Sequence, residues 1–176
     1  LASASPKRLK LLFAAGQGDG NLRGLNHLGH DGLMQQVIGG HWGLIPKLGK
    51  LALDNKIKAY NWPQGCISQL YRDIAAGKPG MLSKVGLHTF VDPRIEAGRI
   101  NEVTEDPLLS IMSLNGQDYL FYPRQEINVA LIRGTSADGN GNVINSEYIN
   151  GDGAVNSLGP VAYIDNQPVE ATVYYE

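Results

Sequence analysis

The first strands predicted by the hydrophobic pattern lie close to the amino terminus. Residues 8–14 form an apolar run typical of a buried strand, and the glycine-rich stretch at 16–20 predicts the turn that ends it. A second apolar pair, Val37 and Ile38, runs directly into two glycines. This pair predicts another short strand that ends in a tight loop.

Helical signals accompany these strands. Asp31 is a suitable N-cap for a short helix over residues 32–36. Pro46 is favourable in the first turn of a second helix, and the residues after it give that helix an apolar face up to about residue 55. The predicted order is therefore strand, helix, strand, helix.

The clearest unit follows. Residues 56–60 alternate polar and apolar side chains as a strand does, residues 61–65 form a turn, and apolar residues recur at helical spacing over 67–75. Strands that alternate with helices predict an α/β fold, with an open and mostly parallel sheet flanked by helices. Ligands of such sheets bind at the carboxyl ends of strands, where Gln17 and Gln64 both fall.

The remainder of the chain predicts loops and β-hairpins toward the carboxyl terminus. Residues 78–106 are loop-rich, and an Asn-Gly pair at 115–116 between two apolar runs is a strong hairpin signal. Residues 127–132 are typical of a core strand. Turn-forming residues dominate from about residue 137, and residues 161–175 predict a further hairpin.

Composition narrows the functional classes. The 176 residues carry a formal net charge of −2 without clusters of lysine and arginine, so neither nucleic acid nor a membrane surface is an expected partner. Cys66 is the only cysteine, which excludes an internal disulfide and favours a reducing compartment. No apolar run reaches the roughly 18 residues that a membrane span needs. We therefore expect a cytoplasmic protein.

One candidate binding segment is the glycine-rich loop after the first strand. It could contact a phosphate or a pantetheine group, although it lacks the Walker spacing and its lysine. A purely structural turn is the alternative interpretation. The loop consists of Gly16, Gln17, Gly18, Asp19 and Gly20.

A second candidate is the start of the helix after residue 61. Gln64 and Gly65 lie where unpaired backbone N–H groups and the helix dipole favour negative charge. A glutamine side chain adds another donor, so the pair could stabilise an oxyanion formed when an acyl group is attacked. Simple capping of the helix by Gln64 is the alternative interpretation.

Other reactive side chains have plainer interpretations. His27, His30 and His41 lie among glycines without a metal-binding motif, so ordinary loop histidines are favoured and no metal is expected. Cys66 has no Cys-His signature around it and is expected to be a small buried side chain. No spacing pairs the candidate carboxylates for acid–base work; these are Asp19, Asp92 and Glu96.

Five short motifs succeed one another with consistent spacing. They are AAGQGDG at 14–20, GGHWG at 39–43, NWPQG at 61–65, VGLHTFVDPR at 85–94 and VALIRGTSAD at 129–138. Their ordered succession, over about residues 6 to 144, resembles the family I coenzyme A transferases. The resemblance is to the acetate/propionate and 3-oxoacid type in particular.

The resemblance implies transfer of coenzyme A between short-chain acyl-CoA and carboxylic acids. In this family a glutamate in the second half of the enzyme attacks the thioester, giving an acyl anhydride and then a glutamyl-CoA thioester. A second carboxylate then collects the coenzyme A. Coenzyme A is thus a substrate, and no cofactor is expected.

The resemblance also assigns site residues. The glutamine of the family's Pro-Gln-Gly turn helps to form an oxyanion hole, a role that maps onto Gln64, while Gly65 keeps the shape of the turn. Two further segments resemble regions that line the substrate and CoA cleft. Their candidate residues are Gly16, Gln17, Gly18 and Asp19 in the first, and Val85, Gly86 and Phe90 in the second.

The resemblance covers only the amino-terminal α-half of such an enzyme. We expect the family's first strand and its second half, with the catalytic glutamate, to be missing, and this chain alone to be inactive. Residues 1–144 would form the α-half-like domain, and residues 145–176 an unassigned β-rich tail. Expected partners are acyl-CoA, short-chain carboxylates and a β-half or β-subunit, in a homo- or hetero-oligomer that serves short-chain fatty acid or ketone body metabolism.

Two other functions are compatible with the same residues. A non-catalytic relic that binds acyl-CoA or another subunit would also lack the glutamate and would explain the unmatched tail. A sugar-phosphate isomerase-like domain is the other alternative, because that fold is related to the CoA-transferases.

Overall fold

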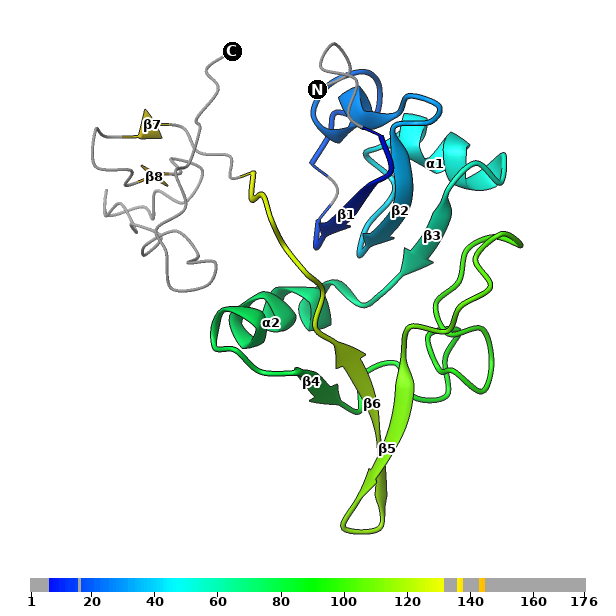
Figure 1. Ribbon diagram of the computed structural model, residues 1–176, viewed down its shortest axis with the longest axis vertical. Helices are drawn as coiled ribbons and strands as arrows, with labels where there is room; N and C mark the ends of the chain where they lie inside the picture. The colour runs from blue at the N-terminus through cyan, green and yellow to red at the C-terminus, as the bar shows by residue number, and fades with distance from the viewer. Residues whose placement is uncertain (1–6, 16, 132–135, 138–142, 145–176) are drawn as a thin grey trace, which may run out of the picture. The chain divides into compact units, whose positions relative to one another are not determined.

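The computed structural model describes residues 7–15, 17–131, 136–137 and 143–144. The chain divides into two compact units, Leu1–Arg124 and Gln125–Glu176. Most of the described residues belong to the first unit. This unit contains a parallel sheet, an antiparallel sheet and the helices that pack on them (Figure 1).

Three parallel strands form the predicted sheet. In spatial order they are β1 (Leu9–Phe13), β2 (Met34–Gly39) and β3 (Lys58–Asn61). Helix α1 (Pro46–Leu53) begins at the predicted proline and connects β2 to β3. The predicted α/β architecture with a parallel sheet is therefore confirmed.

Burial on both faces of β2 explains the layering of this sheet. Val37 and its register partner Ala59 are fully buried and belong to the hydrophobic cluster that includes residues of α1. Ile38 and its partner Tyr60 belong to a second cluster on the side of α2 (Gln64–Ala75). A middle strand covered on both faces needs apolar residues in succession, which is the pattern seen at Val37 and Ile38.

The predicted helix at residues 32–36 is wrong, because this segment turns into β2. Gly32 has a φ of +77°, which an α-helix does not contain, and Met34 already pairs with Leu9 of β1. Leu33 and Met34 are both buried. Strand pairing and burial therefore outweigh the local N-cap signal of Asp31. Within the described residues, the short helix of this region comes earlier, as the 3-10 helix η2 (Leu25–Leu28).

A second, antiparallel sheet lies beside α2. Its strands are β4 (Gly80–Ser83), β5 (Ser110–Leu114) and β6 (Gln117–Pro123), with β6 in the middle. In Figure 1 the arrowheads of β1, β2 and β3 point toward the end of the parallel sheet where α2 begins. Alternate residues of β6 are fully buried in the same cluster as the apolar face of α2, which joins helix and sheet into one core.

The predicted hairpin at 115–116 is confirmed as the link between β5 and β6. Asn115 and Gly116 have φ angles of 51° and 72°, so both turn residues adopt the left-handed conformation. A two-residue hairpin of this kind favours the Asn-Gly pair, since asparagine and glycine tolerate positive φ best. The turn chemistry is therefore consistent with the register of these two strands, in which Leu114 pairs with Gln117.

The long segment between β4 and β5 covers the outer edge of β3. The backbone N–H of Asn61 donates to the carbonyl of Gly98 at 2.7 Å, and that of Ile100 donates to the carbonyl of Ala59 at 3.0 Å. The Asn101 side chain donates to the carbonyls of Ala52 and Ile57. This segment thus protects an edge that would otherwise present unpaired backbone groups.

The described residues after Arg124 include less regular structure than predicted. No strand contains residues 125–131, and the side chains of Val129 and Leu131 are 74% and 64% exposed. The predicted core strand is therefore wrong for its described part, because an apolar run becomes a strand only when another strand pairs with it. β7 (Ser136–Ala137) and β8 (Val143–Ile144) form a short antiparallel pair.

Some predictions for the end of the chain are untested. The hairpin predicted at 161–175 lies outside the described residues. The domain division at residue 144 stays a prediction. Neither α-helix of the described part reaches the length and hydrophobicity that a membrane-spanning helix requires.

Candidate functional site

The start of α2 and the ends of β1 and β2 meet at the carboxyl edge of the parallel sheet. The N–H of Gly40 donates to the carbonyl of Phe13 at 3.1 Å, and that of Trp62 donates to the carbonyl of Gly39 at 3.1 Å. Gln64 follows two residues later as the first residue of α2. The structure therefore places Gln64 at the edge where α/β sheets bind ligands.

The amino terminus of α2 has free donor groups. Pro63 occupies the N-cap position without a side-chain capping bond, and the first turn contains no acidic residue. The N–H of Ile67 bonds to the carbonyl of Pro63, which leaves the earlier N–H groups of this turn without helical partners. Gln64 and Gly65 are both exposed. Since Gln64 makes no capping bond, the capping interpretation of this residue is wrong.

A groove begins beside this helix terminus and runs between α2 and β4. Its volume is about 730 Å³. A Cβ atom added to Gly65 would meet nothing within 4 Å, so a ligand can approach the backbone here. The groove brings together two predicted site residues, Gly65 and Val85. Its lining includes Gly65, Cys66, Gln69, Met81, Val85 and Phe121.

The predicted loop after β1 has a local structural explanation. The Asp19 carboxylate accepts hydrogen bonds from the N–H groups of Arg23 and Asn21, which lower its pKa. A Cβ on Gly18 would lie 2.2 Å from the carbonyl oxygen of Leu44, so this glycine allows the loop to pack against the segment before α1. Gln17, Gly18 and Asp19 do not line the groove, and Gly16 lies outside the described residues.

The other predicted loop is anchored by a tyrosine. The Tyr122 hydroxyl donates to the carbonyl of Val85 at 2.7 Å. Gly86 has a φ of +98°, and a Cβ there would lie 2.8 Å from the same hydroxyl oxygen. The anchored loop leaves Val85 and Phe90 about half exposed. No local sequence pattern predicts this contact of Tyr122, because the two residues are 37 positions apart.

Cys66 is buried, as predicted, although it lines the groove. Burial raises the pKa of its thiol, and contacts with Tyr122 and Ser83 offset this only in part. A thiolate is the nucleophilic form of cysteine, and burial in an apolar setting disfavours it. This environment does not support a role for Cys66 as a nucleophile.

The candidate carboxylates are not arranged for acid–base catalysis. Asp92 is fully buried and accepts bonds from the Arg94 side chain and from the N–H groups of His88 and Arg94. The Arg94 guanidinium above all holds the pKa of this carboxyl well below its usual range. Asp92 thus fixes the loop that carries Val85 and Phe90, whereas Glu96 lies exposed on it.

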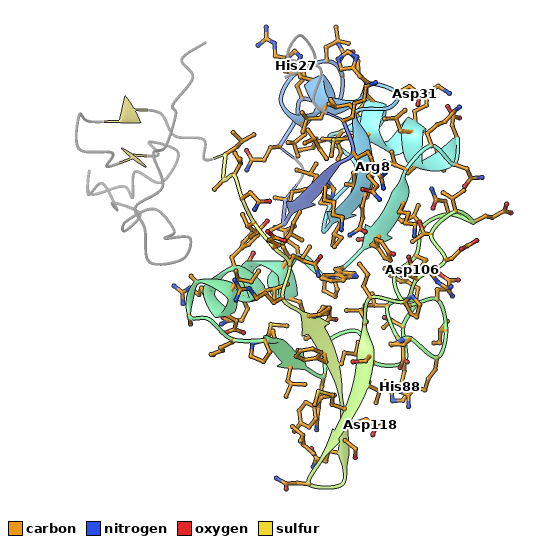
Figure 2. The ribbon with its side chains drawn as sticks, viewed as in Figure 1. Arg8, His27, Asp31, His88, Asp106 and Asp118 are labelled. Carbon is orange, nitrogen blue, oxygen red and sulfur yellow. The ribbon has the colours of Figure 1, made fainter. Side chains whose placement is uncertain are left out.

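The histidines do not assemble a metal site within the described part of the chain. Figure 2 shows His27 beside the parallel sheet and His88 near the antiparallel hairpin, well apart. Among residues 7–15, 17–131 and the two short strands after them, no three His, Cys, Asp or Glu side chains lie close enough to hold a metal ion.

Comparison with known proteins identifies relatives. Acetate CoA-transferase YdiF of Escherichia coli K12 is 40% identical over 137 residues, which cover 78% of this chain and 26% of that protein. Caffeate CoA-transferase of Acetobacterium woodii is 41% identical over 138 residues, with the same coverage. The α-subunit of the acetoacetyl-CoA:acetate/butyrate CoA transferase of Clostridium acetobutylicum is 29% identical over 119 residues, 48% of its length. The chain thus spans about a quarter of the first two relatives.

Structural comparison agrees with the sequence. The crystal structure of YdiF from E. coli O157:H7, a thioester complex with CoA, superimposes with a TM-score of 0.78 at 37% identity. The match covers 84% of this chain and 29% of that one. The family model for coenzyme A transferase matches residues 8–161. This chain belongs to the coenzyme A transferase family.

Proposed function

We propose that this chain supplies the α-half of the active site of an acyl-CoA:carboxylate CoA-transferase. The observation that carries the proposal is the uncapped, exposed start of α2 at the carboxyl edge of the parallel sheet, with Gln64 at its first position. The relatives support this chemistry, because each is named as a CoA-transferase that acts on a carboxylic acid: acetate, caffeate, or acetate and butyrate.

In the proposed reaction the thioester carbonyl oxygen points at the start of α2. A glutamate carboxylate attacks the thioester carbon, and the carbonyl oxygen becomes an oxyanion. The Gln64 side-chain amide and the free N–H groups of the first turn donate to this oxyanion, aided by the helix dipole. Collapse of the intermediate breaks the C–S bond, releases CoA thiolate and leaves an acyl-glutamyl anhydride.

The second step transfers CoA to the glutamate. The thiolate attacks the glutamyl carbonyl of the anhydride, which releases the first carboxylate and forms a glutamyl-CoA thioester. A second carboxylic acid then runs the same two steps in reverse. No redox change occurs, so the cycle needs only the two carboxylates, CoA and the glutamate.

We also propose that the groove between α2 and β4 takes the acyl portion or the adjoining pantetheine arm. The groove starts at Gly65, where backbone and solvent meet without a side chain between them. Met81, Val85 and Phe121 give it apolar walls.

The glutamate is proposed to come from a β-half. The Clostridium relative is itself an α-subunit, which supports a division of the active site between two polypeptides or two halves. A functional assembly would then pair this chain with a β-half in a homo- or hetero-oligomer.

A substitution at Gln64 tests the proposal directly. In the enzyme assembled with a β-half, Gln64→Ala is expected to lower kcat at least about 100-fold, the usual loss when one oxyanion donor is removed. Ser68→Ala, an exposed change one turn further along α2, serves as the matched control and should leave turnover unchanged. Full turnover in Gln64→Ala would remove this residue from the mechanism.

A further inference from the structure

Gly40, the residue after β2, lies directly against the start of α2. A Cβ atom built on this residue would lie 2.3 Å from the carbonyl oxygen of Ala14 and 2.8 Å from the Cα of Gln64. The φ of Gly40 is not positive, so the backbone conformation does not require glycine here. The lack of a side chain is needed only for space.

We propose that Gly40 is a positioning residue, which sets where the oxyanion donors of Gln64 and the first turn of α2 stand. This inference rests on the proposed function of Gln64. It adds a residue that the reaction itself never touches, because Gly40 acts only by allowing α2 to start against the ends of β1 and β2.

A methyl group at position 40 would clash with both the segment after β1 and the start of α2, at the Ala14 carbonyl oxygen and at the Gln64 Cα. Ordinary van der Waals contact begins near 3.4 Å, so the methyl group would have to gain about 1.1 Å from the Ala14 carbonyl oxygen and about 0.6 Å from the Gln64 Cα. Ala14 is packed against the hydrophobic core at the end of β1. Gln64 is exposed at an uncapped helix start, so it has less to hold it in place.

The rest of α2 is fixed independently, which confines the displacement to its first turn. The Tyr71 hydroxyl donates to the carbonyl of Leu12 at 3.1 Å and ties the second half of the helix to β1. Ile67 and Leu70 are fully buried. A shift approaching 1 Å at a catalytic donor can cost up to about 100-fold in rate, while substrate binding elsewhere is unaffected.

The test combines a structural and a kinetic measurement on Gly40→Ala. In the isotope-labelled chain, the amide NMR signals of Gln64 and Gly65 should shift, and those of residues 70–75 should not. In the enzyme assembled with a β-half, kcat should fall about 10- to 100-fold with little change in KM. Gly49→Ala is the matched control, because a Cβ there meets nothing within 4 Å.

A double substitution separates positioning from a general structural effect. If Gly40 acts through Gln64, adding Gly40→Ala to Gln64→Ala should lower kcat by less than the single Gly40→Ala change does. An equal loss in both backgrounds, or unshifted Gln64 signals, would overturn the inference. If Gln64→Ala itself keeps full turnover, the proposed function of Gln64 fails, and the NMR shifts still decide whether Gly40 positions the helix.

A measurement on the unmodified chain covers the case in which Gly40→Ala does not fold. The contact predicts nuclear Overhauser effects between the Hα protons of Gly40 and the Hα and Hβ protons of Gln64. Their absence in a folded chain would contradict the proposed contact.

Discussion

Burial decides the chemistry of the single cysteine, although its position invites a different interpretation. Cys66 lies in the first turn of α2, where a helix dipole would ordinarily favour a thiolate. Burial nevertheless raises the pKa of the thiol and shields it from reagents. At this scale, the surroundings of a residue outweigh its place in a helix.

Thiol alkylation tests this conclusion. At pH 7.5, iodoacetamide should modify Cys66 at least about 10-fold more slowly in the folded chain than in urea, because only the exposed thiolate reacts efficiently. Mass spectrometry of the alkylated protein measures both rates. Equal alkylation rates in the folded and unfolded states would show that the Cys66 thiol is accessible to the reagent, which would contradict this conclusion.

Gln64 and Gly40 show what can be predicted about the site from single residues. The position of Gln64 at a strand end follows from a local succession of strand, turn and helix, so the sequence pattern is sufficient to predict it. The proposed role of Gly40 depends on its closeness to Ala14 and Gln64, 26 and 24 residues away, which no local pattern reveals. The same holds for Tyr122, whose hydroxyl reaches Val85.

At the scale of elements, the loop after β4 is held by an ion pair in which only the carboxylate is buried. Arg94 binds Asp92 through two side-chain nitrogens and reaches Asp118 of the hairpin with a third. Asp92 is buried, while Arg94 and Asp118 are about half exposed. The loop that carries Val85 and Phe90 therefore gains its fixed shape from Asp92, with Asp118 as a secondary contact.

The acid stability of the chain should depend on Asp92. Its folded pKa is lower than the value of about 3.9 for an unfolded aspartate, so the ionised form stabilises the fold above about pH 4. This stabilisation is lost as the pH falls below 4 toward the folded pKa. Asp92→Asn should therefore lower the free energy of unfolding at pH 7 by roughly 2 kcal/mol and flatten its dependence on pH below 5.

Urea unfolding at pH 7, 5 and 3 measures both effects. Asp118→Asn removes the exposed contact of the same arginine and is the matched control, with an expected change below about 1 kcal/mol. The free energy of unfolding of Asp92→Asn and of the unmodified chain could instead fall by the same amount between pH 7 and pH 3. That result would contradict the prediction, because another carboxylate would then cause the loss of stability in acid.

Elements with a local signal were predicted, and those that depend on distant pairing were not. The β5–β6 hairpin follows from an Asn-Gly turn, and α1 follows from Pro46 and the apolar face after it. β4 has only four residues and forms by pairing with β6, about 40 residues later. The wrong helix at 32–36 has the same cause, because pairing with β1 converts that segment into a strand.

At the scale of the whole molecule, the chain belongs to the coenzyme A transferase family. Acetate CoA-transferase YdiF and caffeate CoA-transferase are each about four times as long as the region that matches this chain. The described part of the chain contains the parallel sheet, the uncapped helix α2 and the groove beside it. In the proposed mechanism these supply oxyanion donors and an acyl site, while the nucleophilic glutamate belongs to the other half. The central claim is therefore that this chain contributes half of an active site.

Acyl exchange tests that claim most directly. The purified chain would be mixed with acetyl-CoA and isotope-labelled propionate, alone and with the β-half of a related enzyme, and labelled propionyl-CoA would be followed by mass spectrometry. We expect product only when the β-half is present. Product from the chain alone would contradict the account by revealing a nucleophile within it, and acyl-CoA binding without product in an assembled complex would reduce the chain to a binding domain.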